Sequence, residues 1–107
     1  MKNTVLLFLV IALLVHIVPI FTDVQFLWAE HIPYFITYSA AFLAIAKYSE
    51  KRIVWRWIYI IAVIYPLYDH FLGLIRSIQN NNTVGIIACV AVWIFLPMGL
   101  YLVFKRS

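Results

Sequence analysis

A long run without a charged side chain, from Val84 to Phe104, most restricts what this chain can fold into. A helix rises about 1.5 Å per residue, so this run covers the roughly 30 Å hydrocarbon core of a lipid bilayer. Only 11% of the residues are charged and 66% are hydrophobic, whereas soluble domains carry about 25% charged residues to cover their surface. We therefore expect an all-α protein that is embedded in lipid.

Three further apolar stretches predict three more membrane-spanning helices. The second is the least regular of them. A start near Leu27 makes it long enough to cross the bilayer and places Glu30 and His31 in its first turn. The prediction is an integral membrane bundle that forms one transmembrane domain, residues 1–107. Its four helices are expected over about 4–22, 27–46, 53–75 and 84–104.

Basic residues are distributed unevenly over the predicted loops. With four spans, seven Lys and Arg fall on the side of both termini, and Arg76 alone falls on the other side. The seven are Lys2, Lys47, Lys51, Arg52, Arg56, Lys105 and Arg106. Short cytoplasmic loops of multi-pass proteins carry such an excess of Lys and Arg. We therefore predict a multi-pass protein of the cell (inner or plasma) membrane, with both termini in the cytoplasm.

Titratable side chains gather in the outer half of the membrane that this topology predicts. Asp69 lies about 18 Å along the third helix from Trp57, where that helix is expected to enter the hydrocarbon. This depth is past the midplane. His16 is equally far from Thr4, at the same level of the first helix. An Asp at the centre of a span costs about 2.5 to 3.5 kcal/mol, so it should face the bundle interior. The predicted outer-half cluster is Asp69, His70, His16, Glu30 and His31.

Several functions use carboxylates and imidazoles inside a membrane. Such groups relay protons in transporters and bind divalent transition metals, so a site that handles protons or a divalent metal is the leading hypothesis. One alternative is a membrane subunit in which two histidines bind a haem iron from both sides. Another is a non-catalytic accessory or immunity-type protein, in which Asp69 pairs with His16 or Arg76 and only fixes the helix register.

Motifs typical of common enzymes are absent from the sequence. It contains no HExxH, CxxC, glycine-rich phosphate loop or G-x-S-x-G elbow, so no catalytic residue is assigned and the sequence favours a non-enzyme. The net charge is +4, but the basic residues are split among three short segments between or beside apolar stretches. This distribution is typical of residues that orient a membrane protein and not of a nucleic-acid-binding patch. The expected partner is the lipid bilayer. The sequence leaves open a homodimer or a larger membrane complex, because four short helices enclose little interior.

Overall fold

The structure, a computed structural model, consists of four α-helices. It describes residues 1–22 and 28–105, apart from the side chains of Pro19, Trp28, Ala29 and Glu30. The helices are α1 (Lys2–Thr22), α2 (Trp28–Lys47), α3 (Arg52–Gln79) and α4 (Thr83–Phe104). The described residues contain no strand, so the expected all-α fold is confirmed.

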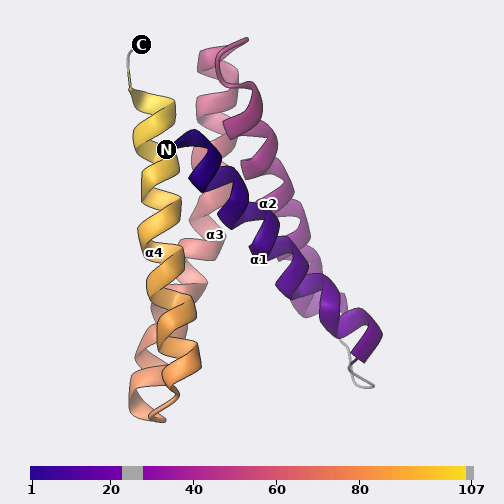
Figure 1. The fold of residues 1–107 in the computed structure, drawn as a ribbon, viewed down its shortest axis with the longest axis vertical. Helices are drawn as coiled ribbons and strands as arrows, with labels where there is room; N and C mark the ends of the chain where they lie inside the picture. Colours follow the sequence, from indigo (N-terminus) through magenta and orange to yellow (C-terminus); the bar gives the residue numbers. More distant parts are fainter. Residues whose placement is uncertain (23–27, 106–107) are drawn as a thin grey trace.

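Two of the four helices diverge along the molecule. α2 packs against both α1 and α3, and α3 packs against α4, whereas α1 contacts α4 much less extensively. Figure 1 shows that α1 and α4 approach each other near the N-terminus and separate toward the opposite end. The N-terminus and the last turn of α4 lie at the same end, which we call the terminal end. The opposite end, where the helices spread apart, is called the open end.

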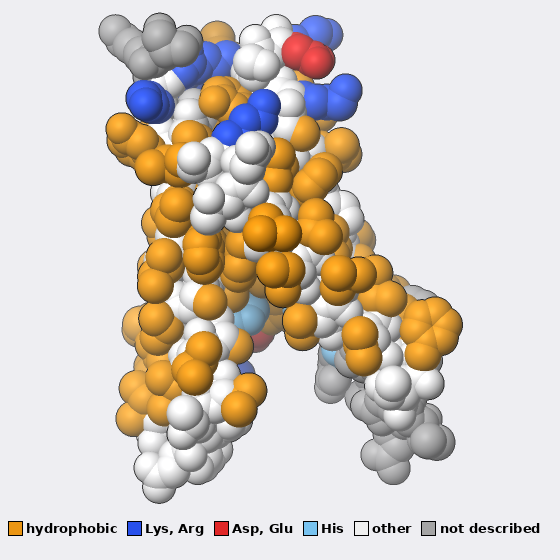
Figure 2. All heavy atoms as spheres, viewed as in Figure 1, with side chains coloured by type: hydrophobic (Ala, Val, Ile, Leu, Met, Phe, Trp, Pro, Cys, Tyr) orange, Lys and Arg blue, Asp and Glu red, His pale blue; other side chains and the backbone are white. Residues whose placement is uncertain are grey.

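The exposed surface of the molecule is largely apolar. Leu7, Ile61 and Ile87 are each more than half exposed, and they belong to α1, α3 and α4. In the described part of the chain, these three helices are long and apolar enough to cross a membrane, and α2 is not among them. Figure 2 shows hydrophobic side chains along the length of the helices and Lys and Arg side chains gathered at the terminal end.

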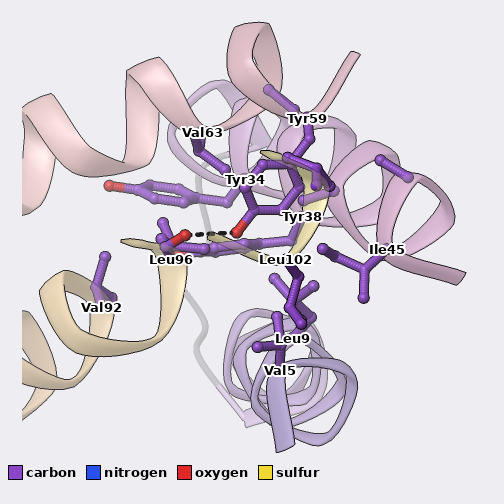
Figure 3. Close-up of a cluster of buried hydrophobic side chains, with 14 residues drawn as sticks. Val5, Leu9, Tyr34, Tyr38, Ile45, Tyr59, Val63, Val92, Leu96 and Leu102 are labelled. Atoms are coloured by element: carbon purple, nitrogen blue, oxygen red, sulfur yellow. Dashed lines mark hydrogen bonds between the residues drawn. The ribbon is translucent and has the colours of Figure 1, made fainter. Parts of the chain in front are cut away.

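The packed core occupies the terminal half of the molecule. Completely buried side chains come from the first part of α1 and α3 and from the last part of α2 and α4. They include Val5, Leu9, Ile45, Tyr59, Leu96 and Val103. The Tyr59 hydroxyl donates a hydrogen bond to the carbonyl oxygen of Leu96 over 2.7 Å (dashed line in Figure 3). A Cβ at position 99 would collide with that hydroxyl, so Gly99 allows α3 and α4 to approach this closely.

The connection between α3 and α4 is shorter than expected. The predicted third helix ends at residue 75, but α3 continues to Gln79, and α4 begins at Thr83. Three asparagines therefore form the whole turn. Asn81 has a left-handed backbone with φ of 53°. Asparagine tolerates this conformation better than most residues do.

Backbone hydrogen bonds explain why three residues are enough for this turn. The Asn81 amide donates to the carbonyl of Ile78 (3.3 Å). The Asn82 amide donates to the carbonyl of Ser77 (2.8 Å). Together these bonds form a Schellman motif, which pairs carbonyls that the end of a helix otherwise leaves open. The Asn82 side chain accepts a hydrogen bond from the Gly85 amide (3.1 Å) and caps α4.

Candidate functional site

Four of the five predicted site residues lie in the open half, on three helices. His16 belongs to α1, His31 to α2, and Asp69 and His70 to α3. All four side chains are half-buried. Glu30 lies in the first turn of α2, and its side chain is outside the described part of the structure.

His16 and His31 face each other across the interface of α1 and α2. Their Nδ1 atoms are 3.2 Å apart, and their rings meet edge to face with centroids 5.5 Å apart. Two imidazole nitrogens at hydrogen-bond distance need one hydrogen between them, because two lone pairs repel. When both rings are neutral, one therefore carries its hydrogen on Nδ1 and the other on Nε2.

The carboxylate of Asp69 accepts a hydrogen bond from a residue outside the predicted cluster. The Tyr34 hydroxyl, on α2, donates a hydrogen bond to Oδ2 of Asp69. Tyr34 is only 7% exposed. The sequence suggested His16 or Arg76 as the partner of this carboxylate, and Arg76 is exposed in the structure. The hydrogen bond joins α2 to α3 through the neutral side chain of Tyr34.

Tyr34 also joins the two parts of the cluster. Its ring stacks on the ring of His16, with centroids 4.4 Å apart and planes inclined by 11°. The His70 ring meets the Tyr34 ring edge to face at 5.6 Å. His16 is also close enough to Asp69 and His70 to interact with them electrostatically. One tyrosine therefore contacts two imidazoles and the carboxylate.

His70 is oriented by its own helix. Its Nδ1 lies 2.8 Å from the carbonyl oxygen of Pro66. A carbonyl oxygen only accepts hydrogen bonds, so Nδ1 carries the hydrogen and donates it. In the neutral ring the lone pair is then on Nε2. His70 can take up a proton or bind a metal only through that atom.

A pocket of about 210 Å³ lies beside this cluster. His16, Tyr38 and His70 contribute its polar groups, and residues of α1 and α4, such as Ala12 and Ala88, form its apolar walls. Figure 2 shows a hollow between the spread helices in which histidine and acidic side chains are visible. The pocket thus gives access to the imidazoles from the side, where α1 and α4 diverge.

The donor atoms of the described residues set a limit on metal binding. Among the side chains that the structure describes, no three from His, Cys, Asp or Glu are placed so that they could hold one ion. His16 and His31 form the closest pair of nitrogen ligands described above. A third protein ligand would have to come from a side chain outside the described set, such as Glu30.

Tyr34 is the site residue that sequence reasoning missed. It follows Glu30 by four residues, so the two share a face of the second helix, as do the small and polar residues further along. That periodicity indicates the side of α2 that faces the bundle. It is the signal that could have shown that Tyr34 faces the bundle interior, where Asp69 is also expected.

Comparison of the chain with known protein families, with curated proteins and with solved structures finds no match.

Proposed function

We propose that this chain is a multi-pass membrane protein whose four helices cross the bilayer, and whose open half binds and transfers a proton at Asp69. The apolar exposed surface and the gathering of basic side chains at one end support this placement (Figure 2). It puts both termini in the cytoplasm and the open end on the outer side. α2 crosses as part of the bundle, with its polar face against α1 and α3.

The observation that carries the proposal is the hydrogen bond from Tyr34 to Asp69 next to the imidazoles of His16 and His70. A carboxylate within the membrane is costly unless it is paired or hydrogen-bonded, and such residues commonly mark ion or proton pathways. An imidazole can accept a proton on one ring nitrogen and donate one from the other, so it can relay protons. A proton taken up by one of these rings would be balanced by the charge of Asp69, so the cluster can change protonation without a large net charge in lipid.

The pocket supports the proposal because it lies directly beside the imidazoles of this cluster. It is lined by His16 and His70, and its volume of about 210 Å³ exceeds what several water molecules need. Water in the pocket would contact both imidazoles and could carry a proton between them. The packed core closes the path toward the terminal end, so transfer across the whole membrane requires a change in helix packing.

Proton flux into vesicles tests the proposal. The protein is reconstituted in liposomes that contain a pH-sensitive dye, and a potassium diffusion potential is applied with valinomycin. We expect flux above that of empty vesicles for the wild type and flux at the empty-vesicle level for Asp69→Asn. The matched control is Glu50→Gln, which neutralises an exposed carboxylate in the turn between α2 and α3. Wild-type flux equal to that of empty vesicles, or full flux in Asp69→Asn, would contradict the proposal.

Proton binding can also be measured without transport. Infrared difference spectra between two pH values show the carbonyl stretch of a carboxyl group that gains a proton. We expect one such band to be lost in Asp69→Asn and kept in Glu50→Gln. A band that survives in Asp69→Asn would assign the proton to another group.

The 3.2 Å between the Nδ1 atoms of His16 and His31 favours a divalent metal as the second candidate. Two nitrogens bound to one tetrahedral zinc at about 2.0–2.1 Å are roughly 3.3 Å apart. Metal analysis of protein purified without chelators separates the candidates. A metal site predicts stoichiometric zinc that is lost in His16→Ala and kept in Asp69→Asn, whereas the proton site predicts no bound metal and flux that is insensitive to chelators.

The remaining alternatives are tested on the same purified sample. A haem bound between two histidines would give a Soret band in protein expressed with haem available, and we expect none. Absence of flux, metal and Soret band together would favour the accessory or immunity-type function, for which co-purification of a partner in mild detergent is the direct test.

A further inference from the structure

A second pocket lies at the terminal end, far along the bundle from the Asp69 cluster. Its volume is about 200 Å³, and it is lined by Tyr48, Arg52, Leu102 and Lys105. These residues come from the turn after α2, the start of α3 and the end of α4. Two cationic groups, one hydroxyl and an apolar side chain thus surround one small space.

Further contacts place more positive charge at this pocket. The Nζ of Lys2, on α1, lies 5.6 Å from the centre of the Tyr48 ring, so a third cation stands beside a pocket-lining residue. The Nζ of Lys105 lies 5.9 Å from the centre of the Tyr101 ring. Glu50 is in the adjacent turn, but it is exposed and does not line the pocket.

Contacts between α3 and α4 hold the ends of the two helices together next to this pocket. The Nε of Arg56 donates a hydrogen bond to the carbonyl of Val103 over 3.1 Å. Its guanidinium also lies 4.8 Å from the centre of the Phe104 ring. These contacts fix the end of α4 against α3 and leave Arg52 and Lys105 on the pocket wall. Helix packing therefore places the start of α3, which carries Arg52, beside the end of α4, which Lys105 follows.

We propose that this pocket binds the phosphate group of an anionic phospholipid. Arg52, Lys105 and the Tyr48 hydroxyl supply the donors that a phosphate diester needs, and Leu102 supplies an apolar wall for the start of an acyl chain. A cationic surface attracts anionic lipids and repels the positively charged group of zwitterionic ones. The inference rests on the membrane placement proposed above, but not on the proton site.

Lipid retention in detergent tests this site. The full chain is purified in a neutral detergent, mixed with equal amounts of phosphatidylglycerol and phosphatidylcholine, and analysed by native mass spectrometry. We expect one phosphatidylglycerol per chain, with at least about tenfold preference over phosphatidylcholine, because each basic side chain near a membrane surface adds about 1 kcal/mol and 1.4 kcal/mol corresponds to tenfold. Equal retention of the two lipids would overturn the inference, since apolar contact alone would then explain binding.

Two matched double variants distinguish lipid binding in this pocket from a general attraction of anionic lipid to the basic end of the protein. Arg52→Gln with Lys105→Gln removes both cations of the pocket, and Lys47→Gln with Lys51→Gln removes the same charge from exposed positions at the same end. We expect the preference to fall at least about tenfold in the first pair and to stay within twofold in the second. Equal loss in both pairs would overturn the inference. The single variant Lys105→Gln, beyond the end of α4, serves the same purpose if the pocket double variant does not fold.

Competition identifies the source of the phosphate. Inorganic phosphate added at millimolar concentration should leave phosphatidylglycerol bound, because it lacks the acyl chains. Displacement of the lipid by inorganic phosphate would overturn the lipid assignment. Asp69→Asn must retain wild-type lipid preference, so failure of the proton site and failure of the lipid site give different results.

Discussion

The hydroxyl of Tyr34 on α2 donates a hydrogen bond to the carboxylate of Asp69 on α3, at the point where the packed core gives way to the open half. The core lies on the terminal side of this bond, and the pocket with His16 and His70 lies beside it. The bond thus connects the most stable part of the bundle to the group that we propose binds a proton.

Tyr34→Phe should destabilise the protein by about 1.5–3 kcal/mol, because it removes a hydrogen bond to a charged group in a partly buried position. The free energy of unfolding is measured by titration with a denaturing detergent. Tyr68→Phe removes a hydroxyl from an exposed ring next to Asp69 in the chain and should change stability by less than about 0.5 kcal/mol. Equal effects of the two variants would show that the bond contributes no net stability.

Gly99→Ala should destabilise the contact between α3 and α4 by about 1–3 kcal/mol, because the added Cβ would collide with the Tyr59 hydroxyl. The matched change is Gly73→Ala, where the nearest atom to the new Cβ is the Cys89 Sγ at 3.4 Å. That variant should be neutral or more stable, since alanine favours helix by about 1 kcal/mol over glycine. The double variant with Tyr59→Ala, which removes both the hydroxyl and the ring carbons that the new Cβ would meet, should cost less than the sum of the single effects, and additive effects would contradict the collision.

Asn81→Ala should destabilise the turn between α3 and α4 by about 1 kcal/mol, because a Cβ of alanine disfavours the left-handed backbone at φ of 53°. Asn81→Gly should retain or raise the wild-type stability, because glycine enters this region without steric cost. Both are measured by the same unfolding titration. If the alanine variant were as stable as the glycine variant, the turn would adopt another conformation in solution.

Single cysteines should report the topology of the membrane protein that we propose. In a Cys89→Ala background, Asn80→Cys should react with a membrane-impermeant thiol reagent from outside intact cells, whereas Ser49→Cys should react only after lysis. Both positions are exposed and lie in turns at opposite ends of the bundle. The opposite labelling pattern would reverse the orientation and place the Asp69 cluster in the cytoplasmic half.

Helix formation, and with it the distance from Trp57 to Asp69 along α3, could be predicted because both depend on local composition. Uncharged runs specify where helices are favoured in lipid, and the distance from Trp57 to Asp69 along a helix follows from its rise. The end of α3 could not be predicted in the same way. The segment from Ser77 to Thr83 is mostly polar and resembles a loop, but a three-asparagine turn satisfies the helix end and lets α3 continue to Gln79.

The partner of Asp69 depends on how two helices cross, which hydropathy does not specify. Tyr34 is one of seven tyrosines, and no local motif separates it from the others. Its position one turn beyond Glu30 gives the correct helix face but not the neighbour across that face. The meeting of His16 with His31 likewise depends on the packing of α1 against α2. Sequence periodicity can identify which face of a helix points into the bundle. Which residues on two such faces meet depends on the tertiary arrangement.

Because the core is restricted to the terminal half, the two halves of the bundle differ in how tightly their helices are packed. Fully buried side chains such as Leu9, Ile45 and Val103 pack the helices together at the terminal end. α1 has few contacts with α4, and the two helices separate toward the other end, so a change in the gap there breaks few contacts. Local rearrangements cost less free energy where fewer buried contacts break. Of the cluster, His16 lies on the part of α1 that separates from α4, so small movements of α1 would alter the exposure of the cluster while the packed end stays unchanged.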